Sequence, residues 1–163
     1  MQTKHHQAFT MLELTFVIVI IGILSAVAVP RFAATRDDAL ISKARVTVAS
    51  LRNAIATERQ LRVLRGDFTP IASLDSGDGD QFDHPIFDHF DGNTTNSRVL
   101  EYPMTSCRDD DARGCWIRTS NSRYTYRFPH NSTNVVFDSN GSRFDCIPGL
   151  GGAVQDDCNL LVR

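Results

Sequence analysis

The feature that most constrains the fold is a long apolar run, residues 9–29, in which Glu13 is the only charged residue. At the helical rise, these 21 residues extend about 31 Å, close to the hydrocarbon thickness of a bilayer. The run therefore predicts one membrane-spanning segment, residues 9–30. A secretory signal peptide is the alternative, because Lys4 precedes the run and "SAVAV" contains a cleavage-site pattern. The length of the run and its carboxylate argue against a signal peptide.

Helical periodicity continues beyond the apolar run. Pro30 is the only proline and Gly22 the only glycine before Gly66, so we expect nearly continuous helix over residues 10–65. In the stem, residues 31–65, apolar side chains recur at spacings of three and four and predict one buried stripe. The stripe consists of Ile41, Ala44, Val48, Leu51 and Ile55.

The remaining residues, 66–163, predict a small β head. Short runs rich in β-branched and aromatic residues occur at 122–128, 134–138 and 142–146, separated by the turn sequences "PHNST" and "SNG". This pattern favours an antiparallel meander packed on the stem, an α+β fold. Residues 66–121 show few regular patterns and predict a long loop region with at most one short helix or strand.

All four cysteines follow the apolar run, which favours two disulfides in an oxidising compartment. Four cysteines allow three pairings. We favour Cys107 with Cys115 and Cys146 with Cys158, because each pair closes a short loop. The spacing is not C-x-x-C, which argues against a zinc site.

Charge is unevenly distributed between stem and head. Residues 31–65 carry eight Lys/Arg and three Asp/Glu, a net +5, whereas residues 66–163 carry eight and fifteen, a net −7. The two parts either attract each other, within or between molecules, or are simply two solvated surfaces. Three stem arginines recur at intervals of seven and share one helix face: Arg45, Arg52 and Arg59. This face could hold phosphate, but an acidic head repels nucleic acid, so we do not expect DNA binding.

The stretch "AFTMLELTFVIVIIGILSAVAVPRF" resembles the N-terminal signature of type IV pilins and of the pseudopilins of type II secretion. The resemblance covers about a quarter of the chain, residues 4–40. It implies a leader peptide, residues 1–8, that a prepilin peptidase removes between Ala8 and Phe9, with methylation of the new Phe9 amine. Most leaders of this family end in glycine, whereas this one ends in Ala8, a small residue that still allows the close approach of a peptidase.

The resemblance also gives Glu13 a role. A carboxylate in the middle of a bilayer costs about 3 kcal/mol on insertion scales. Pairing with the Phe9 amine of a neighbouring subunit would remove that cost and set the register of the helices. The alternatives are that Glu13 reaches the lipid headgroups or is protonated. Gly22 and Pro30 both weaken the helix and match the family's pattern, in which this segment loses helicity on assembly; a simple kink is the alternative.

Other signals are weaker. Asp78, Asp80 and Asp83 have a spacing related to a calcium loop but lack its glycine and terminal glutamate. A second acidic loop contains a possible metal cluster, for which a solvated surface is the simpler interpretation: His84, Asp88, His89 and Asp91. The N-x-[ST] sequons at Asn93, Asn131 and Asn140 follow from loop composition. No nucleotide-binding or hydrolase motif occurs, so we expect neither an enzyme nor a cofactor, with calcium bound by the three aspartates as the alternative.

These patterns predict a subunit of a type IV pilus-like filament used for adhesion, motility or DNA uptake. Before assembly it would cross the bacterial inner membrane once, with its C-terminus in the periplasm. Its partners would be other pilins, the prepilin peptidase, and an inner-membrane assembly platform with its ATPase. Two alternatives stay open: a pseudopilin of a type II secretion system, and a membrane-anchored periplasmic binding domain that does not polymerise.

Overall fold

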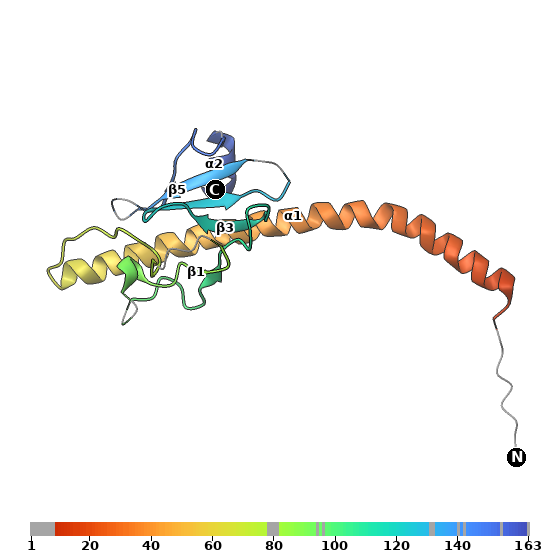
Figure 1. The fold of residues 1–163 in the computed structure, drawn as a ribbon, viewed down its shortest axis with the longest axis horizontal. Helices are drawn as coiled ribbons and strands as arrows, with labels where there is room; N and C mark the ends of the chain where they lie inside the picture. Colours follow the sequence, from red (N-terminus) through yellow and green to blue (C-terminus); the bar gives the residue numbers. More distant parts are fainter. Residues whose placement is uncertain are drawn as a thin grey trace, which may run out of the picture. The chain divides into compact units, whose positions relative to one another are not determined.

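The computed structural model describes residues 9–77, 82–93, 95, 97–130, 133–139, 141, 143–153 and 155–162. One long N-terminal helix is followed by small antiparallel sheets, so the predicted α+β class is confirmed (Figure 1). The elements are α1 (Met11–Leu64), β1 (Pro85–Ile86), the 3₁₀ helix η1 (Phe90–Gly92), β2 (Met104–Thr105), β3 (Cys115–Arg118), β4 (Arg123–Arg127), β5 (Asn134–Asp138), β6 (Asp145–Cys146) and α2 (Gln155–Val162).

Helix α1 ends at a glycine, close to the position that the sequence predicts. Gly66 has a φ of 79°, the left-handed conformation that commonly follows a helix. Its N–H donates to the carbonyl of Val63 at 3.0 Å, and the N–H of Asp67 donates to the carbonyl of Arg62 at 2.9 Å. These two bonds satisfy carbonyls that would otherwise lack partners at the end of the helix.

Internal contacts divide the chain into two units, Met1–Arg36 and Asp37–Arg163, with the division inside α1. In the first unit, α1 contains an 18-residue window of mean hydropathy 2.6, none of it buried. Length and composition therefore allow this part of α1 to cross a membrane. The second unit holds the rest of α1 together with both sheets, so the stem from Asp37 onward shares one core with the head.

The main sheet has four antiparallel strands in the order β3-β4-β5-β6. Its central register pairs Trp116 with Tyr126 and Tyr124 with Phe137. Strands β1 and β2 form a separate two-stranded ladder in which Ile86 pairs with Met104.

The predicted meander was correct for β4 and β5 but wrong at its two ends. The strand expected at 142–146 is reduced to Asp145–Cys146, and β3 forms a strand that the sequence reading placed in a loop. Helix α2 was not predicted. The expectation of at most one short element in residues 66–121 was also wrong, because β1, η1, β2 and β3 all begin there.

The core of the second unit lies between α1 and the main sheet. The predicted stripe on the stem is confirmed, because all five of its side chains are buried: Ile41, Ala44, Val48, Leu51 and Ile55. Aromatic rings fill the opposite side. Phe87 lies 4.9 Å from Tyr124 and 5.6 Å from Trp116, measured between ring centroids, and Phe137 stacks on Phe144 at 4.9 Å.

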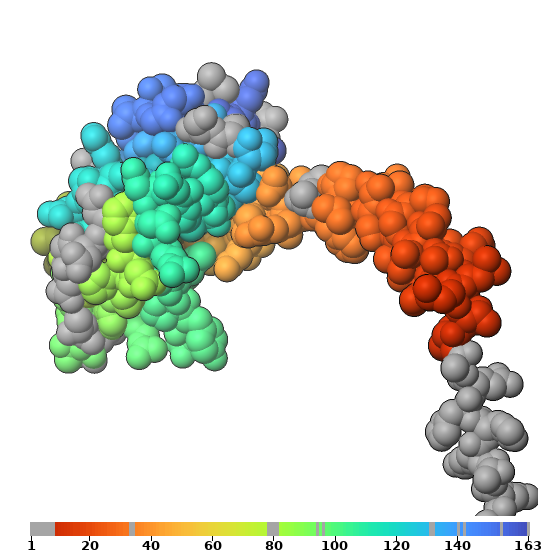
Figure 2. Space-filling view, turned by 45° about the vertical axis from the view of Figure 1, so that its right-hand side comes forward, coloured from red at the N-terminus to blue at the C-terminus, as the bar shows by residue number. Residues whose placement is uncertain are grey.

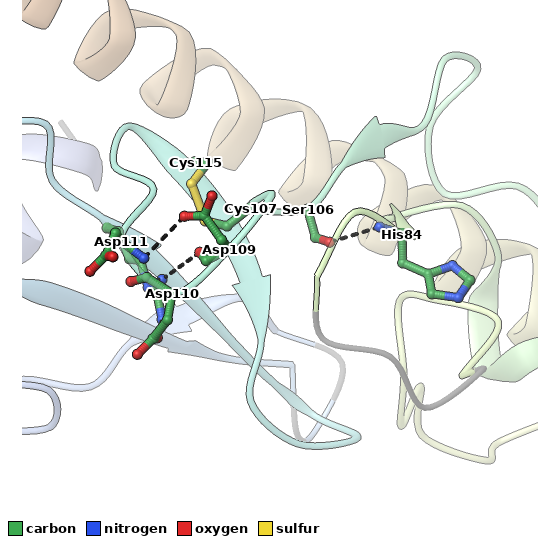
Figure 3. Close-up of a disulfide and its surroundings, with 8 residues drawn as sticks. His84, Ser106, Cys107, Asp109, Asp110, Asp111 and Cys115 are labelled. Carbon is green, nitrogen blue, oxygen red and sulfur yellow. Dashed lines mark hydrogen bonds and ion pairs between the residues drawn. A yellow bond between two sulfur atoms is a disulfide. The ribbon is translucent and has the colours of Figure 1, made fainter.

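Two disulfides join Cys107 to Cys115 and Cys146 to Cys158, the pairing that short loops favour. Figure 3 shows the first disulfide beside the turn that carries Asp109, Asp110 and Asp111. The second disulfide ties β6 to α2. Each disulfide therefore fastens a short element, β3 or α2, to a neighbouring segment of the head.

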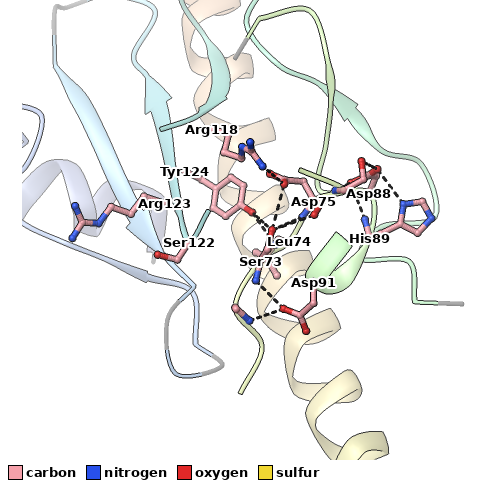
Figure 4. A network of polar contacts seen from close by, with 12 residues as sticks. Ser73, Leu74, Asp75, Asp88, His89, Asp91, Arg118, Ser122, Arg123 and Tyr124 are labelled. Carbon is pink, nitrogen blue, oxygen red and sulfur yellow. Dashed lines mark hydrogen bonds and ion pairs between the residues drawn. The ribbon is translucent and has the colours of Figure 1, made fainter. Parts of the chain in front are cut away.

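Side-chain carboxylates organise the loops between α1 and β3 (Figure 4). Asp91 accepts the N–H groups of Ala72 and Ser73 at 2.7 and 3.0 Å and also pairs with Arg62 at 2.7 Å. Asp88 accepts the N–H of Ser76 at 2.8 Å. The loops are thus held by side-chain contacts to the backbone, which leave no periodic pattern in the sequence.

Candidate assembly site in the N-terminal helix

Helix α1 begins with a capping arrangement around Glu13. Thr10 precedes the helix, and its Oγ1 accepts the backbone N–H of Glu13 at 3.2 Å. The carbonyl of Thr10 accepts the N–H of Leu14 at 3.1 Å, the first helical bond. Thr10 is therefore the N-cap and Glu13 the third helical residue, the spacing of an S/T-x-x-E capping box. The sequence "TMLE" shows this spacing, so the start of the helix could be predicted from it.

The position of Glu13 at the start of α1 is electrostatically favourable. The N-terminal end of a helix carries a partial positive charge, which stabilises a carboxylate in the first turn. Glu13 is nevertheless exposed, and among the described residues it forms no ion pair. It lies in an open groove along the helix that is lined mainly by Leu12, Phe16 and Val19. The side chains around the Glu13 carboxylate are thus mainly apolar.

The surface around Glu13 is mainly apolar from Phe9 to Val29. Phe9 is 78% exposed, Met11 82% and Leu12 81%. Further exposed apolar side chains follow up to Val29 and Phe32. A soluble monomer rarely exposes a continuous apolar surface of this length, so lipid or other helices must cover it.

Gly22 and Pro30 both lie within α1. A Cβ added at Gly22 would meet no atom within 4 Å, so no contact inside the described chain requires glycine there. Pro30 has no N–H to donate to the carbonyl of Ala26, one turn earlier. Both residues therefore reduce the stability of the helix locally without a compensating contact within the described part of the chain.

The stem arginines bind the head of their own chain. Arg45 donates from Nε and Nη2 to the carbonyl of Leu160 in α2 at 3.0 and 2.8 Å. Arg52 donates from Nε to the carbonyl of Phe144 at 3.0 Å and lies 3.4 Å from the carboxylate of Asp145. Arg52 thus meets an opposite charge within the molecule, and both guanidinium groups bind the C-terminal segment rather than forming a free phosphate-binding stripe.

The other predicted sites receive little support. Ala8, Asp78 and Asp80 lie outside the described residues, as do Asn131 and Asn140. Asp83 is exposed, and its backbone N–H donates to the carbonyl of Cys107 at 2.9 Å. Within the described ranges, no group of three or more His, Cys, Asp or Glu could hold a metal ion.

Asp88 and His89, which the sequence placed in a candidate metal cluster, form a local pair instead. The ring Nδ1 of His89 lies 3.0 Å from the carboxylate of Asp88, which also accepts the hydroxyl of Ser76 at 2.7 Å. Burial alone would raise the pKa of Asp88, but these hydrogen bonds outweigh it and lower the pKa below its usual value. The carboxylate is thus fully used in organising its loop.

The comparison with protein-family models finds a match in the same segment of the chain. Residues 3–29 match the prokaryotic N-terminal methylation motif, a range that includes Phe9, Glu13 and Gly22. Over 50 residues, the chain is 50% identical to the type IV narrow pilus major component PilA5 of Thermus thermophilus. The aligned part covers 31% of this chain and 43% of that protein, less than half the length of either. No solved structure shows a significant match. The predicted resemblance to pilins is therefore confirmed for the N-terminal segment.

Proposed function

We propose that this protein is a structural subunit of a type IV pilus-like filament that polymerises through its N-terminal helix. The observation that carries the proposal is Glu13, an exposed carboxylate in the first turn of an exposed apolar helix, inside the matched methylation motif. A structural subunit needs a surface that is stable only when covered by copies of itself. The exposed apolar side chains between Phe9 and Phe32 support this proposal, because copies of the same helix could cover them.

Cleavage between Ala8 and Phe9 would create a positively charged partner for Glu13, which forms no ion pair among the residues that the structure describes. The new α-amino group on Phe9 is positively charged, and N-methylation retains that charge. In a bundle of staggered helices, the Phe9 amine of one subunit meets the Glu13 carboxylate of its neighbour. A subunit in the wrong register leaves both charges unpaired in apolar surroundings, which is costly. The pair therefore selects the correct register.

The same proposal gives a role to Gly22 and Pro30, which lower the stability of α1 locally. Before assembly, residues 9–30 span the inner membrane, with the disulfide-containing head in the periplasm. Gly22 and Pro30 let the helix extend locally when the subunit leaves the membrane for the fibre. A prepilin peptidase, an inner-membrane platform and its ATPase supply processing and energy. We expect the fibre to serve adhesion, motility or DNA uptake.

The test replaces the carboxylate and keeps the helix apolar. Glu13→Val should insert into the membrane at the level of the unaltered protein but be absent from sheared surface fibres, as judged by electron microscopy. Val17→Leu, a neutral exchange one turn away, is the matched control and should assemble normally. Fibres of normal yield from Glu13→Val would contradict the register role.

The N-terminus gives a second readout. Mass spectrometry of the assembled protein should find a chain that starts at a methylated Phe9, and Ala8→Leu should accumulate the uncut precursor. A mature protein that still starts at Met1 would exclude processing. A pseudopilin of a secretion system would show the same N-terminus in short periplasmic fibres, so fibre length and location separate these two assemblies.

A further inference from the structure

The far end of α1 exposes a group of apolar side chains to solvent. Leu64 is 83% exposed and Phe68 71%, while Leu61 and Val63 are 41% and 43% exposed. These four residues, which we call the end patch, lie at and just after the end of the helix. Figure 1 shows this end of α1 in yellow, at one edge of the second unit. Single exposed apolar side chains are common, but a group of them marks an interaction site.

A polar hollow of about 380 Å³ begins beside the end patch. Its lining includes three carboxylates and two guanidinium groups: Glu58, Asp67, Asp91, Arg62 and Arg65. Arg62 pairs with Glu58 at 2.9 Å and with Asp91 at 2.7 Å. Asp67 accepts the N–H and the hydroxyl of Thr69 at 2.9 and 2.6 Å.

Arg65 is the charged group of this hollow that is left over. It follows Leu64 directly, is exposed, and takes part in none of the ion pairs found among the described residues. The end of α1 therefore presents an apolar surface with one positive charge beside it. A partner that fits this surface carries an apolar anchor next to a carboxylate.

The loop of residues 101–103 carries that combination. Tyr102 is 85% exposed, and Glu101 beside it is exposed and absent from the ion pairs of the described residues. Leu100 and Met104, on either side of the loop, pack against the core and hold its two ends. A tyrosine is a common anchor of protein interfaces, because it supplies a large ring at a low cost in conformational entropy.

The loop and the end patch occupy different places along α1. The hydroxyl of Thr47 lies 3.6 Å from the sulfur of Met104, which places the end of the loop beside this part of the helix. Leu64 lies 17 residues further on, about 26 Å at the helical rise. In Figure 2 the green part of the chain, around residue 100, projects from the lower surface of the head. A contact between two different surfaces can be repeated from copy to copy, which suits a fibre.

We propose that the loop of residues 101–103 docks on the end patch of the next copy in the fibre. The Tyr102 ring packs on Leu64 and Phe68, and Glu101 pairs with Arg65. The occupant is a second copy of this chain, because the chain itself carries both the exposed ring and the complementary charge. This inference rests on the proposed filament and adds a contact between heads, offset along the stem, to the packing of the N-terminal helices.

Photo-crosslinking of the full chain tests the contact directly. Benzoyl-phenylalanine in place of Tyr102 keeps an aromatic ring, and ultraviolet light should join it to a second copy in sheared fibres. Electrophoresis should show a covalent dimer, and mass spectrometry should place the cross-link at Leu64 or Phe68. The same amino acid in place of Arg113, an exposed residue of the turn before β3, is the control and should give roughly tenfold less dimer.

A charge exchange tests the ion pair. Glu101→Arg and Arg65→Glu should each lower the yield of sheared fibre roughly tenfold, the effect of losing an interface anchor. The double variant should restore the yield, because the pair is re-formed with its signs reversed. Phe68→Ser removes an exposed ring without opening the core and should also lower the yield. Asp111→Arg, at another exposed position, is the matched control and should assemble normally.

The outcomes separate this contact from the filament itself. A thiol-blocking assay should find both disulfides formed in every variant, so that a loss of fibres is not a loss of folding. Fibres that give no dimer from position 102, or a cross-link to residues 9–32 instead of the end patch, would overturn the head contact and leave the filament proposal intact. A double variant no better than the worse single variant would overturn the ion pair. If the unaltered protein forms no fibre and is not processed, the filament proposal fails and the head contact with it.

Discussion

At the scale of single residues, short polar contacts decide where backbone elements begin. Thr10 fixes the start of α1 by accepting the N–H of Glu13, and it thereby places the carboxylate in the first turn. An uncapped N–H in an apolar environment would lack any partner, because lipid offers none. In lipid, the hydroxyl of Thr10 therefore contributes more to the stability of the helix start than it would in water, which could bind the N–H instead.

Replacing this cap gives a direct measurement. Thr10→Ala should cost about 1 kcal/mol at the helix start, and exchange of the Glu13 amide hydrogen in detergent micelles should become roughly fivefold faster. Thr10→Ser keeps the hydroxyl and should exchange at the original rate. Equal exchange in both variants would show that Thr10 does not cap the helix in solution.

Asp88 predicts how the stability of the head depends on pH. Because its pKa is lower in the folded than in the unfolded protein, its contribution is complete above the usual value of 3.8 and is lost as pH falls through the folded value. Asp88→Asn should therefore melt at a lower temperature at pH 7. Its melting temperature should also fall less than that of the unaltered protein between pH 5 and pH 3. Parallel melting curves across this range would assign the acid sensitivity to other carboxylates.

At the scale of elements, the parts predicted from sequence are those with a repeating pattern. Helix α1 has an apolar run and a stripe at helical spacing, and β4 and β5 have consecutive β-branched and aromatic residues. Strand β3 was missed because it has only four residues, and adjacent Trp116 and Ile117 are both buried, which removes any alternation. Helix α2 was missed because Cys158 and contacts from α1, rather than its own sequence pattern, hold it in place.

The same distinction applies to the assembly site. Glu13, Gly22 and Pro30 could be singled out because they interrupt an otherwise uniform apolar helix. The roles of Asp88 and Asp91 could not be predicted, because their partners are backbone groups of residues 72–76, which no spacing rule identifies. The engagement of Arg45 and Arg52 by the C-terminal segment likewise depends on tertiary structure.

Arg45 tests how α2 is held. Arg45→Ala removes two charge-assisted hydrogen bonds to Leu160, so we expect a loss of about 1 to 3 kcal/mol of stability and faster reduction of the Cys146–Cys158 disulfide by dithiothreitol. Lys43→Ala, an exposed neighbour on α1, should change neither quantity. If reduction is equally fast in both variants, Arg45 does not hold the segment.

At the scale of the whole molecule, the two units differ in whether their apolar residues are exposed or buried. The first unit exposes its apolar residues, whereas the second unit buries a complete aromatic core and contains both disulfides. A chain of residues 37–163 should therefore be soluble without detergent and unfold in a single transition. The longer chain starting at Phe9 should need detergent or lipid. An aggregated or unfolded product from residues 37–163 would show that the head depends on the preceding helix.

The single tryptophan of the chain, Trp116, is 1% exposed and packed among the rings of Tyr126, Phe137 and Phe144. Its emission therefore reports on one place only, the interior of the head, with no second indole to obscure the signal. The fluorescence maximum of Trp116 should lie at a shorter wavelength while the aromatic core is folded and should shift to a longer wavelength once water enters. The purified protein thus contains its own optical probe, which can follow the opening of the head without any added label.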